Sequence, residues 1–96
     1  MTSLKNNYRF RRLTEILRID GLRATVKFDD GCERVFDGAV YGALLPRTEL
    51  TRPLIDKSLF KSAFIDNGNL AWPNGFDVFS EEVYNHGGRH PKVKGC

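Results

Sequence analysis

The stretch "LRATVKFDDGCERVFD", residues Leu22 to Asp37, decides the fold. Polar and apolar residues alternate along its first half, which is typical of a strand with one buried face. The apolar positions are Leu22, Ala24, Val26 and Phe28, and the polar positions are Arg23, Thr25 and Lys27. Asp29-Asp30-Gly31 then predicts a turn, because Gly31 accepts the positive φ that a type I turn with a bulge requires.

Two registers fit the hairpin that this turn would close. A three-residue loop places Phe28 opposite Cys32 and Lys27 opposite Glu33, a favourable pair of charges. A two-residue loop at Asp30-Gly31 would instead oppose Lys27 to Arg34. The first register is therefore predicted, with a returning strand from Cys32 to about Asp37.

The neighbouring segments add a strand before the hairpin and an irregular connection after it. Residues 13–19 contain Thr14, Ile16, Leu17 and Ile19 and favour a strand. Residues 38–55 have no sustained period, and their glycines and prolines predict an ordered but irregular connection. Its leucines should be buried, and Asp56 should cap a short helix from Lys57 that turns Leu59, Phe60 and Ala63 inward. The leucines are Leu44, Leu45, Leu50 and Leu54.

Turn residues organise the rest of the chain. Asn67-Gly68 between apolar runs predicts a second hairpin, and Pro73 should end its second strand at Trp72. A short strand over residues 76–79 and a capped helical turn over residues 80–84 should follow.

The predicted fold class is α+β. It has an antiparallel, hairpin-built sheet of four or five strands, one short helix and a C-terminal helical turn. Residues 10–84 would form a single compact domain. Residues 1–9 would form a basic flexible N-terminal arm, and residues 85–96 a basic flexible tail.

Composition excludes some classes of protein and leaves others open. The 96 residues are 41% hydrophobic and 28% charged, which indicates a soluble globular domain and neither a disordered nor a membrane protein. No spanning apolar run and no signal peptide is visible, so a cytoplasmic protein with free thiols at Cys32 and Cys96 is expected. The charge of residues 1–27 is +5, that of residues 28–84 is −5, and that of residues 85–96 is +3.

The segment Trp72-Pro73-Asn74-Gly75 has two interpretations. An aromatic anchor, a strand stop and two residues permissive of chain reversal are fully explained as a turn. The alternative is a recognition surface, in which a partly exposed indole and neighbouring residues contact a protein partner. The residues assigned to that surface are Trp72, Asn74, Phe76, Asp77 and Tyr84.

A second hypothesis is nucleic-acid binding. "YRFRRL", residues 8–13, interleaves arginine with aromatic residues, a pattern suited to phosphate contacts and base stacking. An edge strand protected by charge explains the same pattern. The residues of this hypothesis are Arg9, Arg11, Arg12, Arg18 and Arg23, with Lys27 beside them.

Catalysis is not expected. Glu81 and Glu82 are adjacent on a helix, about 100° apart, so they do not face each other as hydrolytic carboxylates do. His86, His90 and Cys96 lie in a glycine-rich segment without a second cluster of ligands. The sequence therefore predicts no enzyme, no metal site and no cofactor.

Taken in order, these motifs resemble the small bacterial family called domain of unknown function twenty-four forty-two. The likeness covers about residues 13–84. It rests on the strand ending Phe-x-Asp-Gly, on Arg34 and Asp37, on the Pro-Leu-x-Asp entry to the Leu-Phe helix, and on the closing Trp-Pro-Asn-Gly-x-Asp with Tyr84.

The resemblance implies a compact α+β domain without an assigned reaction. Some members are encoded beside another small protein, in an arrangement suggestive of a toxin–antitoxin or mobile-element pair. Others carry a helix-turn-helix, which does not follow Tyr84 here. The expected function is thus a bacterial protein-interaction module whose partner is a small protein, from an adjacent gene in the case of a pair. Nucleic-acid binding is the alternative, no membrane contact is expected, and a homo-oligomer is left open.

Overall fold

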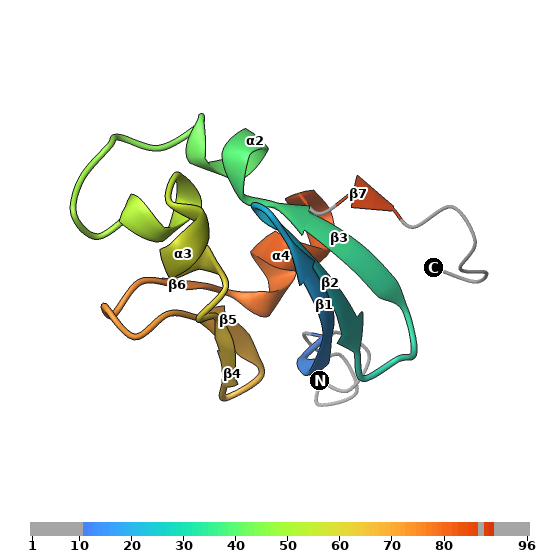
Figure 1. The fold of residues 1–96 in the computed structure, drawn as a ribbon. Coiled ribbons are helices and arrows are strands. Elements are labelled where there is room, and N and C mark those ends of the chain that lie inside the picture. Colours follow the sequence, from blue (N-terminus) through green and yellow to red (C-terminus); the bar gives the residue numbers. More distant parts are fainter. Residues whose placement is uncertain (1–10, 87, 90–96) are drawn as a thin grey trace, which may run out of the picture.

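Two antiparallel sheets carry the fold. The computed structural model describes residues 11–86 and 88–89. Sheet A has the order β1-β2-β3-β7 and sheet B the order β4-β5-β6, with short helices beside them (Figure 1). The strands are β1 Leu13–Asp20, β2 Arg23–Phe28, β3 Glu33–Asp37, β4 Phe64–Asp66, β5 Asn69–Ala71, β6 Asp77–Val78 and β7 Gly88–Arg89.

The α+β class and its antiparallel hairpins are confirmed, but a single sheet of four or five strands is wrong. The described residues form seven strands in two sheets. Sheets A and B approach each other where the amide of Leu13 donates to the carbonyl of Gly68 at 2.9 Å. Alternation along a sequence identifies strands, but it does not say which strands pair, so it could not separate the two sheets.

The hairpin of β2 and β3 has the predicted register. Lys27 pairs with Glu33, and the amide of Phe28 donates to the carbonyl of Cys32 at 2.8 Å. Gly31 has a φ of 88°, as the bulged turn requires. The hairpin of β4 and β5 is also confirmed, with positive φ at both Asn67 and Gly68.

The helices are short and are placed by their caps. Asp56 caps α3 (Lys57–Phe60), as predicted, by accepting from the amides of Ser58 and Leu59. Asp37 caps α2 in the same way. The other short helices are α2 Gly38–Gly42, the 3₁₀ helix η1 Arg52–Leu54 and α4 Ser80–His86, which contacts both β3 and β5.

The expected burial of the connecting segment holds only in part. Leu54 and Phe60 are fully buried, and Leu45 and Ala63 pack against the core. Leu44 and Leu50 are 66% and 51% exposed, and Leu59 is also exposed, so the prediction was wrong for these three. Leu44 and Leu50 lie in turns outside the helices, and Leu59 lies on α3, whose four residues bury only Phe60.

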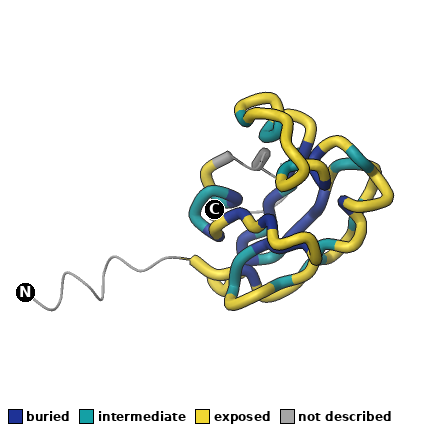
Figure 2. Tube along the Cα trace, turned by 90° about the vertical axis from the view of Figure 1, so that its left-hand side faces the viewer, coloured by how far each residue is buried: buried dark blue, intermediate teal, exposed yellow. Residues whose placement is uncertain are grey.

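The core lies between the two sheets and the helices (Figure 2). Trp72 stands among aromatic rings, with centroids 5.5 Å from Phe60, 5.5 Å from Phe76 and 6.5 Å from Phe36. Its indole Nε1 donates to the carbonyl of Phe60 at 2.9 Å. The buried tryptophan therefore has its polar atom satisfied as well as its rings packed.

Regular structure continues beyond Tyr84, the expected end of the domain. Helix α4 runs to His86, and β7 pairs with β3 through Val35 and Gly88. Arg9, the predicted arm over residues 1–9 and the tail from residue 90 lie outside the described residues.

Cys32 differs from its expected state. It is disulfide-bonded, so the prediction of a free thiol there is wrong, while Cys96 lies outside the described residues.

Within residues 11–86 and 88–89, no helix has both the length and the apolar character needed to cross a bilayer.

Candidate functional site

The Trp72–Phe76 turn repeats the construction of the Phe28–Cys32 turn. In both turns, the amide of the first residue donates to the carbonyl of the fifth, and the amide of the fourth donates to the carbonyl of the first. The fourth residue is a glycine of positive φ, which is 97° at Gly75. In both, the third side chain accepts from the fifth amide: Asp30 from Cys32 at 2.9 Å, and Asn74 from Phe76 at 3.1 Å. The turn interpretation of this motif is therefore sufficient to explain its glycine and its asparagine.

Trp72 and Phe76 do not offer their rings to a partner. Trp72 is 2% exposed and Phe76 is also buried, and both belong to the hydrophobic core. A partner could reach the indole only by opening that core, so these two residues no longer belong to a contact surface. The aromatic anchor of the turn points inward because the core between the sheets needs its volume.

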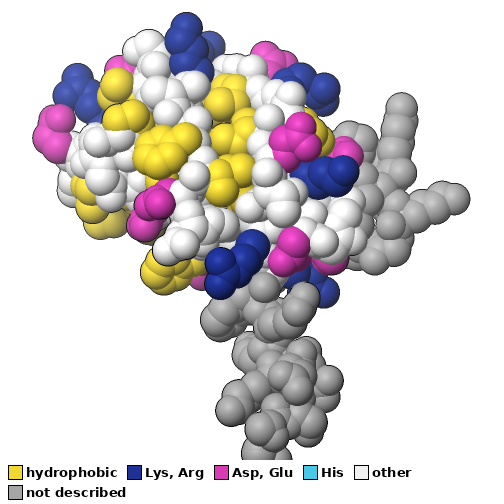
Figure 3. Space-filling view, turned by 90° about the horizontal axis from the view of Figure 1, so that it is seen from below, with side chains coloured by type: hydrophobic (Ala, Val, Ile, Leu, Met, Phe, Trp, Pro, Cys, Tyr) yellow, Lys and Arg dark blue, Asp and Glu magenta, His cyan; other side chains and the backbone are white. Residues whose placement is uncertain are grey.

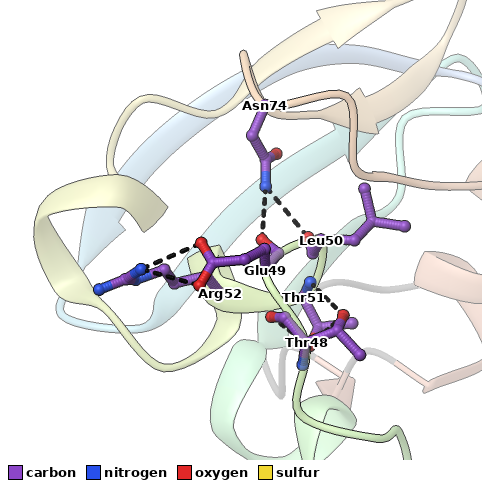
Figure 4. A network of polar contacts seen from close by, with 6 residues as sticks. All are labelled: Thr48, Glu49, Leu50, Thr51, Arg52 and Asn74. Carbon is purple, nitrogen blue, oxygen red and sulfur yellow. Dashed lines mark hydrogen bonds and ion pairs between the residues drawn. The ribbon is translucent and has the colours of Figure 1, made fainter.

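The side-chain NH2 group of Asn74 binds the irregular connection formed by residues 38–55. Its Nδ2 donates to the carbonyls of Glu49 and Leu50, both at 3.1 Å (Figure 4). The loop is closed further by Thr48 and Thr51, which exchange side-chain and backbone bonds. An aspartate could accept at this position, but it could not donate to two carbonyls. Asn74 is thus a positioning residue for residues 48–52.

A small hollow lies beside the turn. It has a volume of about 350 Å³ and is lined by Pro53, Leu59, Ser62, Trp72, Pro73 and Asn74. Its lining is almost entirely apolar, and it contains no charged side chain. The hollow therefore lacks the convergent polar groups that orient a small ligand.

Asp77 lies on an exposed face with two phenylalanines. Phe64, Ala71 and Asp77 are cross-strand partners in sheet B, so their side chains share one face. Burial alternates from Phe76 to Ser80, which turns Phe79 outward on the side of Asp77. Phe79 is 64% exposed and Phe64 is 44% exposed. We name Phe64, Asp77 and Phe79 the aromatic face.

Viewed from below the orientation of Figure 1, hydrophobic side chains gather in the middle of the surface, with acidic and basic side chains around them (Figure 3). Phe64 and Phe79 were not among the residues predicted for the contact surface. The alternation of Phe76, Asp77, Val78 and Phe79 could have predicted that Phe79 points outward once Phe76 was assigned to the core.

A groove adjoins the aromatic face at Phe79. It has a volume of about 380 Å³ and lies between the start of β1, the β4–β5 turn and the start of α4. Its lining residues are Arg12, Asn67, Asn69, Phe79, Ser80, Glu81 and Glu82. The amide of Ser80 donates to Oδ1 of Asn69 at 2.8 Å, which ties α4 to the hairpin. The groove therefore combines an aromatic wall with two carboxylates and one guanidinium.

Tyr84 lies elsewhere, at the end of sheet A beside the Phe28–Cys32 turn. Its ring meets Phe28 edge-on at 5.0 Å and stacks against the guanidinium carbons of Arg34 at 4.2 Å and Arg11 at 4.4 Å. Its hydroxyl lies 3.6 Å from Sγ of Cys32. Nε of Arg34 donates to its carbonyl at 3.2 Å, while Nη1 of Arg34 is buried and has no hydrogen-bond partner among the residues that the structure describes. These contacts explain Tyr84 as a residue that joins α4 to sheet A.

The arginines of the nucleic-acid hypothesis are not gathered into one basic patch. Arg11 pairs with Asp30 at 2.7 Å and Arg23 with Asp37 at 3.1 Å. Arg12 lines the groove beside Glu81 and Glu82. Arg18 lies on β1 opposite Thr25, and Arg9 lies outside the described residues.

The outer face of sheet A alternates in charge across its strands. Glu15, Lys27 and Glu33 stand in one row of the register, and Asp20, Arg23 and Asp37 stand in another. Each basic side chain has an acidic neighbour on both sides, at the spacing where opposite charges attract. This face is close to neutral and does not form the extended cationic surface that phosphate requires.

Two carboxyl groups have shifted pKa values. Burial opposes ionisation of Asp30, but the amide of Cys32 and the guanidinium of Arg11 outweigh it and lower the pKa of Asp30. The hydroxyl of Ser58 and the amides of the α3 cap lower the pKa of Asp56. Both shifts belong to turn and cap geometry, so neither carboxyl is poised as a general acid or base near neutral pH.

The part of the chain that the structure describes contains no group of three or more histidine, cysteine, aspartate or glutamate side chains placed to hold a metal ion.

No family model, curated protein or solved structure matches this chain.

Proposed function

We propose that the chain is a protein-interaction module without catalytic activity, and that the aromatic face is its contact surface. The observation that carries this proposal is the exposure of Phe79 and Phe64 on the face of sheet B that also carries Asp77. Large apolar side chains left in water cost free energy unless a partner covers them, and aromatic residues dominate the binding energy of interfaces. Of the residues expected at the surface, Asp77 remains in this proposal.

The partner is a small bacterial protein, encoded in a gene next to that of this chain. The resemblance to the bacterial family supports this part, because some of its members are encoded in two-gene pairs. A pair of the toxin–antitoxin or mobile-element kind would act in the cytoplasm. Two small proteins made together would also explain why a single chain keeps an uncovered aromatic face.

Co-expression with the product of the neighbouring gene tests the proposal. The two proteins should elute together in size-exclusion chromatography, and Phe79→Ala should weaken the complex by about thirtyfold or more, as expected at a hot spot. Val40→Ala is the matched control, since Val40 is 63% exposed on α2 and outside the aromatic face. Failure to form a complex, or equal affinity of the two variants, would contradict the proposal.

Nucleic-acid binding stays the alternative. It would depend on Arg12 and Arg18 and on basic residues outside the described part of the chain, because Arg11 and Arg23 already pair with carboxylates. The paired charges and the alternating face of sheet A support protein contact over phosphate contact.

A further inference from the structure

We propose that the partner binds the aromatic face and its groove through a basic segment that presents lysine or arginine together with apolar residues on one side. This inference rests on the proposed function and adds the chemistry of the segment. It follows from the charge around the two exposed phenylalanines.

Carboxylates outnumber cations around this surface. Asp66 lies two residues from Phe64 on the same face of β4, Asp77 lies two residues before Phe79 on that face, and Glu81 and Glu82 line the groove. Arg12 is the basic residue that shares the groove with them. The surface therefore attracts a cationic segment and repels an acidic one.

Three of these carboxylates are available to a partner. The ion pairs found among the described residues join Arg11 to Asp30, Arg23 to Asp37 and Arg52 to Glu49. None of them uses Asp66, Asp77 or Glu81. A carboxylate in an ion pair already contacts a cation, whereas Asp66, Asp77 and Glu81 can each form an ion pair with a cation of the partner.

The exposed rings suit the same chemistry. An ammonium or guanidinium group gains energy over the face of a phenylalanine, and more so when a partner excludes water. The aliphatic stems of lysine and arginine, and apolar residues between them, would cover Phe64 and Phe79. An extended segment places every second side chain on one side, so cations and apolar groups can meet the acids and rings in turn when they follow one another at every second position.

Arg12 and Asn67 favour one direction for a segment bound in the groove. Arg12 directly precedes β1 and lines the groove together with Glu81 and Glu82, so its guanidinium can donate to a carbonyl or carboxylate of the bound segment. Asn67 lines the same groove and can donate to or accept from the segment's backbone. A basic segment would therefore bind in one direction, with its cations toward Glu81 and Asp77.

Three synthetic heptapeptides, N-acetylated and C-amidated, test the inference with the full chain. KSLSKSL is basic, ESLSESL is acidic and QSLSQSL is neutral, and in each of them the leucines share one side of the extended segment with the lysine, glutamate or glutamine side chains. Each is titrated into ¹⁵N-labelled protein by NMR. The basic peptide should shift the amides of residues 64–66, 77–79 and 81–82 and should bind at least about tenfold more tightly than the neutral one. Raising the salt from about 50 mM to about 300 mM should weaken it.

Variants locate the contact. The double change Asp77→Asn and Glu81→Gln should weaken the basic peptide about tenfold, and Phe79→Ala should weaken it comparably. Glu33→Gln, an acid on the outer face of sheet A, is the matched control and should bind as the unchanged chain does. All four positions are on the surface or at its rim, and amide chemical shifts report directly whether each variant is folded.

The outcomes separate this inference from the proposed function. Equal binding of the neutral and basic peptides at the aromatic face overturns the basic segment but leaves the face as a contact surface. Tighter binding of the acidic peptide, or no effect of the double change, also overturns it. If the product of the neighbouring gene forms no complex with this chain and no peptide shifts the amides of residues 64–82, both the basic segment and the proposed function are overturned.

Discussion

Asn74 shows how one side chain can serve both a turn and a distant loop. Asp30 holds the equivalent place in the other bulged turn and needs only to accept, whereas Asn74 also donates to two carbonyls across the chain. The choice between aspartate and asparagine at these two turns follows from the donor that residues 49 and 50 require.

Asn74→Asp should therefore keep the turn and release the loop. The carboxylate still accepts from the amide of Phe76, but it faces the carbonyls of Glu49 and Leu50 without a proton to donate. We expect a loss of about 1–2 kcal/mol in the free energy of unfolding, which lowers the Tm by about 4–8 °C for each kcal/mol. Thermal unfolding measures the loss, and hydrogen exchange should speed up at residues 49–52. Unchanged exchange there would show that Asn74 does not hold the loop.

At the scale of elements, glycine has two separate uses in the hairpin turns. Gly31 and Gly68 have similar φ values, 88° and 81°. A Cβ at Gly31 would meet nothing within 4 Å, whereas a Cβ at Gly68 would lie 2.9 Å from Cβ of Arg12 and 3.0 Å from its Cγ. Gly68 is thus required both by its backbone angle and by the close approach of β1.

Gly31→Ala and Gly68→Ala form a matched pair that separates these uses. Gly31→Ala should cost about 1–2 kcal/mol for the left-handed backbone alone. Gly68→Ala should cost about 1–3 kcal/mol more, because the start of β1 must move away. Urea denaturation of the two variants measures the difference. Equal losses would mean that Arg12 yields freely and that the contact between the two sheets there is loose.

The cap of α3 and the turn before β3 predict how stability depends on pH. Folding lowers the pKa of Asp56 and Asp30 below the ordinary value of 3.8. Their contribution is therefore complete above that ordinary value and is lost as the pH falls through the lower pKa values of the folded state.

The double variant Asp30→Asn and Asp56→Asn checks this dependence. Asparagine still accepts from the turn and cap amides but does not titrate. The Tm of the double variant should therefore fall less than the Tm of the unchanged chain between about pH 5 and about pH 2. Thermal unfolding across this range compares the two proteins. Parallel curves would show that other carboxyl groups govern acid unfolding.

These elements also show which parts of the structure could be predicted from the sequence. Asp-Gly, Asn-Gly and the Asp56 cap impose local backbone demands, and each was placed correctly because few residues meet them. The exposure of Leu44 and Leu50 and the burial of Trp72 depend on distant segments that periodicity does not describe. The aromatic face was missed for the same reason, since only the inward position of Phe76 reveals Phe79 as outward.

For the whole molecule, the distribution of charge bears on the choice between protein and nucleic-acid partners. Residues 11–86 carry ten basic and twelve acidic side chains, a net charge of −2, although the complete chain carries +3. The excess of basic residues thus belongs to the two ends of the chain. On sheet A, Lys27 and Arg23 are interleaved with acids, and Arg12 stands beside Glu81 and Glu82 in the groove.

A chain with this charge distribution should bind DNA or RNA only weakly. A protein that neutralises several phosphates releases as many counterions and loses about a thousandfold or more in affinity between about 50 mM and about 200 mM salt. Here the five basic residues outside residues 11–86 are Lys5, Arg9, Arg89, Lys92 and Lys94. Contacts from so few dispersed cations compete with repulsion from an acidic body, so no complex should persist at about 200 mM salt. Fluorescence anisotropy with labelled double- and single-stranded oligonucleotides at both salt concentrations measures this. Binding that persists at the higher concentration and is lost in the double change Arg12→Ala and Arg18→Ala would favour nucleic acid as the partner. Both are exposed arginines of the nucleic-acid hypothesis, and neither takes part in an ion pair found among the described residues.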